Sequence, residues 1–597
     1  MLERLRKLSR ASHPPVLSLA VCAENAPPRK PQSQFEELVR HLLHRFFHNE
    51  LLASDDETRR VMQISYSVAL LTLLVALFLF PSYHAFPPFP FPRPFWLQVG
   101  DHYFFVTYSF VLMGIATVYE WDLLFPDLLD VFVLSILPIA SRRLFLARIT
   151  ALGIFLGLVL LGTSVLGVAF FPLVAELPHP LRHLLAHAVA VCSSGAFATA
   201  SVLALQGILL NVLGERLFRT LGPIVQSLSL SLLLTLLLLV PALSHNIEPI
   251  LTSGSSLAKL LPTFWFLAIY ECLLSGHNAL PLFRSLAATG CWSLAFLCAC
   301  VALTYPLAYR RRVRQLIEGS GASASPSPAS ATLRRLVNAC IVRCPAQRAI
   351  FHFISQSILR AQRQRVMLAM CAGFTLSLVI ANMLVLHVAH HRVHPTLLPA
   401  GIRAAIPITA FWSVVGLRSA MAAPLDRRGA WLFRSTLGQP KPVHFAGTRR
   451  WLTLWSTLLT STAAIALYLL SPASLRTPRV LLAHLILSAG LSSILADLFL
   501  WTTSTLPFTS VRRSSITDFP LIIFKYVVLF PILVAAVVGL DRWMSFSTGH
   551  LLRAAVFLAA THIVLSRVHS RVSATSTDHT FTYDADDLPG SLGLRDG

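Results

Sequence analysis

The chain of 597 residues is 55% hydrophobic and only 13% charged, and its formal net charge is +22. A soluble domain carries about 25% charged residues, so this composition excludes a string of soluble domains and favours a membrane protein. The excess positive charge is spread as arginine over short polar segments. No basic module interleaved with aromatic residues is present, so we do not expect nucleic acid to be a partner.

The first 62 residues are predicted to form a cytosolic N-terminal segment. Residues 1–34 are basic and contain prolines, and no apolar run adjoins the start, so no signal peptide is expected. Residues 35–50 have apolar side chains at helical spacing with Arg and His between them. This pattern predicts an amphipathic helix that lies on the inner membrane surface or packs on the cytosolic face of the chain itself.

Long apolar runs then recur along the chain. A membrane span needs about 20 apolar residues, and backbone amides in lipid must be bonded within the segment, so such runs are helices. The sequence predicts an all-α polytopic membrane protein with about twelve spans, at 63–80, 103–119, 147–171, 184–212, 221–242, 285–308, 364–388, 398–422, 451–471, 481–502, 519–540 and 549–566.

The predicted spans fall into two six-helix halves, 63–308 and 364–566. A basic cytosolic linker, 309–363, divides them and contains a Ser/Ala/Pro tract typical of flexible connections. A polar tail, 567–597, is expected to be disordered. Six spans repeated in one orientation form a parallel repeat, as in many transporters. Two unrelated halves of six helices remain the alternative.

The arginines of the loops predict the orientation. Alternate connections carry Arg clusters, and those between them are poor in Lys and Arg apart from Arg476 and Arg479. Because positive loops stay in the cytosol, both termini are expected to be cytosolic. The fifth connection, 243–284, then lies outside and contains the apolar segment Leu261–Gly276. This segment is too short to span and predicts a re-entrant or interfacial helix, with Trp265 and Tyr270 at the headgroups.

Polar side chains inside apolar runs are costly and mark functional positions. Asp497 is the carboxylate that lies in the middle of a predicted span. It is expected to bond to a neighbouring helix or to contact a substrate in a transport pathway. Near the outer surface, His387, His390, His391 and His394 have the spacing of one helix face. Zinc could bind there, but no carboxylate accompanies them, so a polar helix end is preferred and no metal site is predicted.

An acidic and aromatic segment, Tyr119–Arg148, lies between the second and third spans. It combines acidic residues, aromatic residues, a short apolar helix and an arginine pair, which suggests a docking element on the cytosolic face. The alternative is an ordinary loop with anchoring residues. The residues expected to matter are Glu120, Trp121, Asp122, Phe125, Pro126, Asp127, Pro138, Arg142, Arg143 and Arg148.

These motifs resemble a turn of the type-two permease subunits of ATP-binding-cassette exporters. In that family the turn follows the second span and touches a separate ATPase subunit; the usual lysine of its last motif is Arg148 here. A second-half segment at 418–434 also resembles a turn of large fused bacterial permeases. The residues expected to contact the ATPase there are Arg418, Asp426, Trp431 and Arg434.

The resemblance implies the membrane subunit of an ATP-driven exporter in a bacterial inner membrane. None of the five lysines completes a G-x-x-x-x-G-K motif, so ATP and Mg²⁺ are expected on a partner ATPase, and neither catalytic residues nor a cofactor are expected in this chain. Membrane lipids are the other expected partners. Two alternatives stay open: a lipid-linked glycosyl- or acyltransferase built on the acidic cluster Glu120, Asp122, Asp127 and Asp130, and a secondary transporter.

Overall fold

The structure is a computed structural model. It describes residues 34–47, 70–84, 93–121, 124–126, 131, 138–175, 180–318, 328–389, 392–422, 442–472, 476–501, 507–508 and 524–575. The chain divides into two compact units, one of residues 1–61 and 132–158 and one of residues 62–131 and 159–597. The smaller unit contains α3 (Gln34–Phe47), the amphipathic helix predicted from the sequence, and the first part of α7 (Ser141–Val174).

The larger unit contains nearly all of the long helices. In its first part these are α5 (Phe95–Tyr119), the rest of α7, α8 (Pro180–His245) and α12 (Pro281–Glu318), joined by the short α9 (Ile247–Thr252), α10 (Ser256–Leu260), α11 (Pro262–Ser275) and η2 (Gly276–Asn278). Next come α13 (Pro328–Cys340), α14 (Pro345–Arg360), α15 (Gln362–Met383), α16 (Pro399–Ala422), α18 (Pro442–Leu470), α19 (Pro478–Leu500), η5 (Phe524–Leu529), α21 (Phe530–Phe546) and α22 (Thr548–Thr575).

Ten helices among the described residues are long and apolar enough to cross a membrane. Many of their large apolar side chains are exposed, such as Leu232 (69%), Trp292 (77%) and Leu303 (70%). Such residues would be costly in water, and lipid is the solvent that suits them. The predicted fold class, an all-α polytopic membrane protein, is therefore confirmed.

α8 comprises two antiparallel arms, although it carries one label. Its two apolar stretches are Pro180–Leu213 and Thr220–His245. Gln206 of the first arm bonds to the Trp121 carbonyl, and Gln226 of the second bonds to the Val118 carbonyl. Residues 20 positions apart in a straight helix would lie about 30 Å apart, so the chain folds back between the arms and brings both to the end of α5.

Small and hydroxyl side chains bring α5 close to the first arm of α8. Ser109 donates to the Val191 carbonyl at 2.9 Å, and Ser194 donates to the Val106 carbonyl at 3.0 Å. Lipid gives apolar helices no hydrophobic reason to associate, so close packing and such interhelical bonds hold them together. These reciprocal bonds fix the register of α5 against α8.

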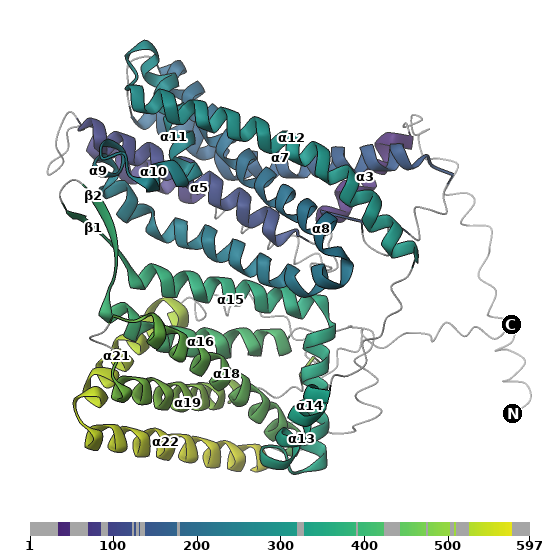
Figure 1. Cartoon of the computed structure of the whole chain (residues 1–597), viewed down its shortest axis with the longest axis vertical. Helices are drawn as coiled ribbons and strands as arrows, with labels where there is room; N and C mark the ends of the chain where they lie inside the picture. The colour runs from purple at the N-terminus through teal and green to yellow at the C-terminus, as the bar shows by residue number, and fades with distance from the viewer. Residues whose placement is uncertain are drawn as a thin grey trace, which may run out of the picture. The chain divides into compact units, whose positions relative to one another are not determined.

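The long helices of the larger unit run side by side, and two sets of short elements mark their opposite ends (Figure 1). We call these the α11 end, with α9, α10, α11 and the strands, and the α14 end, where α14 runs across the ends of the spans. α14 is attached to α18 by side-chain bonds: Arg450 donates to Gln347 Oε1 at 2.7 Å, and Trp451 donates to Ser355 Oγ at 2.8 Å. Much of the predicted basic linker is therefore helical.

The histidine-rich segment after α15 is not helical, contrary to the sequence prediction. β1 (Leu384–Ala389) and β2 (Arg392–Leu397) form an antiparallel hairpin in which His387 pairs with His394. Each strand is a six-residue run of mixed apolar and polar side chains, and a run this short does not show whether its period is that of a strand or of a helix. His390 and His391 lie outside the described residues.

Gly373 of α15 marks a close approach to α8. A Cβ at this position would lie 2.6 Å from the Ser227 carbonyl oxygen, a backbone atom that cannot rotate away. We expect Gly373→Ala to destabilise the protein by about 1–3 kcal/mol, as overpacking does, measured by SDS-induced unfolding in micelles. Gly539→Ala is the matched control, because no atom of the described part of the chain lies within 4 Å of its added Cβ; equal effects of both substitutions would contradict this packing.

Candidate functional site

Some residues of the predicted docking element are buried in the structure, and others are exposed. Glu120, Trp121, Phe125 and Arg148 are buried, whereas Arg142 and Arg143 are exposed. Pro126 is buried as well, and Pro138 is exposed. In the second half, Arg418 is half-buried with its guanidinium 5.6 Å from the Phe499 ring centroid. The remaining predicted residues lie outside the described parts of the chain: Asp122, Asp127, Asp426, Trp431 and Arg434.

The chain that leaves α5 is held by three hydrogen bonds from three different apolar helical stretches. Gln206 Nε2 donates to the Trp121 carbonyl at 2.7 Å, and Gln226 Nε2 donates to the Val118 carbonyl at 2.9 Å. The Tyr305 hydroxyl of α12 donates to the Leu124 carbonyl at 2.6 Å. We call these three bonds the turn clamp. Carbonyls at a helix end lack the regular intrahelical donors, and the turn clamp supplies side-chain donors there in a buried place.

Aromatic packing reinforces the turn clamp. Trp121 is 2% exposed and stacks on Phe218 with ring centroids 6.4 Å apart. Phe125 packs on Tyr305 at 4.9 Å. These aromatic side chains, which the sequence suggested for contact with a partner, pack against spans of the same chain. Arg142 and Arg143 of the same segment, by contrast, are exposed.

Asp497 bonds to neighbouring helices, one of the two roles considered from the sequence. Its Oδ2 lies 2.7 Å from His562 Nδ1 of α22, and its Oδ1 lies 3.6 Å from Arg449 Nη1 of α18. Asp497 itself is fully buried. It therefore links three helices near the α14 end.

The α11 end contains a cluster that the sequence analysis did not identify. His102 of α5 and Glu271 of α11 are 1% exposed each, and His102 Nδ1 lies 2.6 Å from Glu271 Oε1. Tyr270, the neighbour of Glu271, is fully buried. Its hydroxyl lies 2.6 Å from His183 Nε2 and 3.1 Å from His187 Nδ1, both on α8. We call these five residues the histidine cluster; Tyr270, which the sequence predicted at the headgroup level, packs inside it.

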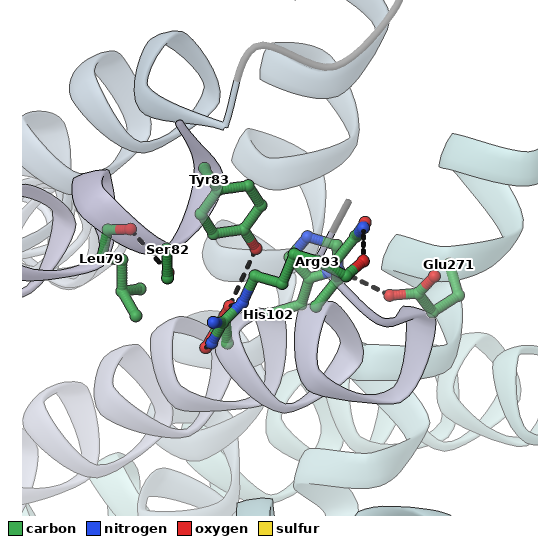
Figure 2. Close-up of polar contacts among 8 residues, drawn as sticks. Leu79, Ser82, Tyr83, Arg93, His102 and Glu271 are labelled. Carbon is green, nitrogen blue, oxygen red and sulfur yellow. Dashed lines mark hydrogen bonds and ion pairs between the residues drawn. The ribbon is translucent and has the colours of Figure 1, made fainter. Parts of the chain in front are cut away.

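An ion pair lies beside the histidine cluster (Figure 2). Arg93 donates to both carboxylate oxygens of Asp101, at 2.7 and 2.8 Å, and the Tyr83 hydroxyl donates to Asp101 Oδ2 at 2.8 Å. Burial alone would lower the pKa of Arg93, but the hydrogen bond and the charge of Asp101 raise it above its ordinary value. Asp101 precedes His102 in the chain, so the ion pair of Arg93 and Asp101, whose two charges cancel, adjoins the cluster.

The second half has a comparable buried ion pair, which also lies at the α11 end of the spans. Arg403 Nη1 of α16 donates to Asp541 Oδ2 of α21 at 2.7 Å, and His484 Nε2 of α19 lies 3.5 Å from Asp541 Oδ1. Asp541 and His484 are 1% exposed. The sequence analysis ended this span at residue 540, whereas α21 continues to Phe546 and carries Asp541 into the interior.

Sequence signals for these sites existed but were ambiguous. His183 and His187 are spaced i, i+4, which places them on one helix face, and Glu271 is a charge within an apolar segment. The partners are remote in sequence: Glu271 is 169 residues from His102. Only the packing of α11 between α5 and α8 brings them together.

The chemistry of the histidine cluster is that of proton exchange. Within the described parts of the chain, no group of three or more His, Cys, Asp or Glu side chains has the arrangement of a metal site. Imidazole, phenol and carboxylate groups within hydrogen-bonding distance can share or move protons. Searches with the chain against protein-family models, curated proteins and solved structures give no match.

Proposed function

We propose that this chain is the membrane permease subunit of an ATP-driven exporter and works with a separate cytosolic ATPase. The observation that carries the proposal is the turn clamp, which ties the start of the predicted docking segment to three apolar stretches of two other helices. A transporter driven by a separate ATPase must pass motion from that subunit to its spans. A turn bonded to several spans moves them together when it is displaced.

Charge and exposure support Arg142 and Arg143 as the contact with the ATPase. Both are exposed at the start of α7. Complementary charges across such an interface would guide association and fix its register. The second contact, around Arg418, Asp426, Trp431 and Arg434, belongs to the same proposal.

The proposed topology has twelve spans in two halves, with both termini in the cytosol of a bacterial inner membrane. The apolar helix Leu70–Tyr83 and η5 with α21 would add two spans to the ten long ones. The paired ionic sites support two related halves. His102 and Arg403 lie in about the first two turns of α5 and α16, and His183 and His484 occupy similar places in α8 and α19.

The experiment is affinity purification of the tagged chain from its native membrane, with mass spectrometry for a Walker-motif ATPase. We expect an ATPase to co-purify with the wild-type chain. Because Arg142→Glu with Arg143→Glu reverses two exposed charges, we expect at least about a tenfold loss of bound ATPase, or about 1.4 kcal/mol.

Arg476→Glu with Arg479→Glu is the matched control, since these two arginines are also exposed but lie at the α11 end of the spans. We expect this pair to leave ATPase recovery unchanged. An absence of any ATPase in the wild-type preparation, or equal losses in both pairs, would contradict the proposal.

A secondary transporter is the second candidate, and the histidine cluster is the observation that favours it. Ionisable groups inside apolar helices are typical of proton relays in pumps and transporters. The two candidates differ in their energy source. Transport driven by a pH gradient across vesicles that contain the chain without any ATPase would favour the secondary transporter, whereas a pH response without transport would not. Of the acidic cluster on which the glycosyl- or acyltransferase alternative was built, Glu120 is buried in the turn, and Asp122, Asp127 and Asp130 lie outside the described residues.

A further inference from the structure

α11 is a short buried helix that polar side chains hold among longer ones. Tyr270 bonds to His183 and His187, and Glu271 bonds to His102. On the same helix, Thr263 Oγ1 lies 3.1 Å from the Tyr103 hydroxyl. The two attachments that involve histidine depend on where the protons are, because an imidazole nitrogen either donates or accepts.

The hydrogen bonds of Tyr270 limit the charge of its two histidines. A phenol hydroxyl has one hydrogen to donate and two lone pairs to accept with. Both bonds form when one neutral histidine accepts the phenol hydrogen and the other donates its own N–H. If both His183 and His187 present N–H groups to the oxygen, the phenol hydrogen has no acceptor in this trio. Protonation of the accepting histidine therefore leaves the phenol hydrogen without an acceptor among these three residues, which is costly in a buried place.

Two ring nitrogens of the cluster are buried and have no hydrogen-bond partner among the described residues. They are Nε2 of His102 and Nδ1 of His183, whose ring centroids lie 5.6 Å apart. The Phe171 ring lies 5.8 Å from each of these rings and 5.5 Å from that of His187. The open nitrogens can take up protons, but the apolar surroundings oppose any charge that lacks a partner.

Among the residues that the structure describes, the charges around the cluster can compensate one added positive charge. The ionisable and phenolic groups that surround it are Tyr83 from the first apolar helix, Arg93 and Asp101 before and on α5, Arg182 on α8, and Tyr270 and Glu271 on α11. Asp101 is already paired with Arg93. Among these groups, Glu271 is thus the carboxylate that bonds to an imidazole of the cluster, that of His102.

We propose that the histidine cluster is a proton-binding site that keeps α11 seated when it carries at most one positive charge and releases α11 when a second proton binds. Histidines that reach water on release titrate near about pH 6.5. The released state then binds more protons than the seated state, so falling pH favours release. This inference rests on the geometry of the cluster and is independent of any partner ATPase.

The experiment measures the position of α11 as a function of pH. Spin labels are placed at Leu273→Cys on α11 and Leu232→Cys on α8, both exposed positions, in a chain whose native cysteines are replaced. Labelling at about pH 8 precedes the measurement, so thiol ionisation does not affect the result. Pulsed electron–electron double resonance is expected to show one distance at about pH 8 and a second, longer population that grows towards about pH 5.

Variants separate the cluster from other pH effects. Glutamine can donate and accept but does not titrate, so His183→Gln with His187→Gln should keep the single distance down to about pH 5. Glu271→Gln removes the compensating carboxylate and should move release to higher pH. His245→Gln alters an exposed histidine at the end of α8 and should leave the wild-type response intact.

A distance distribution that stays unchanged in the wild-type chain over this pH range would overturn the proposal, and this measurement requires no change within the cluster. A wild-type response in His183→Gln with His187→Gln would overturn it too. As a second readout, ¹⁵N NMR of labelled histidines should show histidine protonation over the same pH range as release. Protonation without any release would contradict the proposed link.

Discussion

Replacing Arg403 by Met is expected to destabilise the protein by about 3–5 kcal/mol, one of the largest effects of any single substitution. The change leaves the Asp541 carboxylate, 1% exposed, without the guanidinium 2.7 Å away. Removal of one partner of a buried pair leaves an uncompensated charge, which costs far more than the pair itself contributes. SDS-induced unfolding in mixed micelles measures the loss.

Replacement of both partners is the control. Arg403→Met with Asp541→Leu removes the charge together with its counter-charge, and such double changes are often neutral or stabilising. We therefore expect the double variant to recover most of the lost stability. If the double variant is no more stable than Arg403→Met, the ion pair is not the reason for the loss.

Removal of the turn clamp is expected to disconnect the ATPase from the spans. In the variant Gln206→Leu, Gln226→Leu, Tyr305→Phe, the carbonyls of Val118, Trp121 and Leu124 lose their side-chain donors. Interhelical hydrogen bonds in membranes average about 0.6 kcal/mol each, so the loss of stability should stay near about 2 kcal/mol and the protein should fold. The ATPase should still bind, because Arg142 and Arg143 are unchanged.

The readout requires no knowledge of the substrate. Spin labels at Leu232→Cys and Leu458→Cys, both exposed on long helices, report the distance between α8 and α18 when a non-hydrolysable ATP analogue is added to the complex. The wild-type distance should change and that of the triple variant should not. Asn211→Leu is the matched control, since Asn211 donates to the Thr304 carbonyl and not to the turn; a loss of response in this control as well would contradict a specific role for the turn.

Periodicity and composition predicted much of the helical scaffold. Lipid forces backbone groups to bond within their own segment, so an apolar run that is long enough to cross the membrane forms a helix. That is why α5, α8, α12, α16 and α19 lie where the apolar runs predicted them. The hairpin Leu384–Leu397 was missed because six-residue runs of mixed Val and His carry too little periodic signal, and their structure depends on the neighbours that cover them.

The composition and the apolar runs by themselves determined that this chain is a multi-pass helical membrane protein, because burial of apolar surface in lipid is a local property of each run. Only the tertiary structure decided which charges meet. Glu271 and Asp541 looked like residues of a loop and of a span boundary, and packing placed them against His102 and Arg403. Such pairing depends on contacts between residues more than 100 positions apart, and no local pattern encodes it.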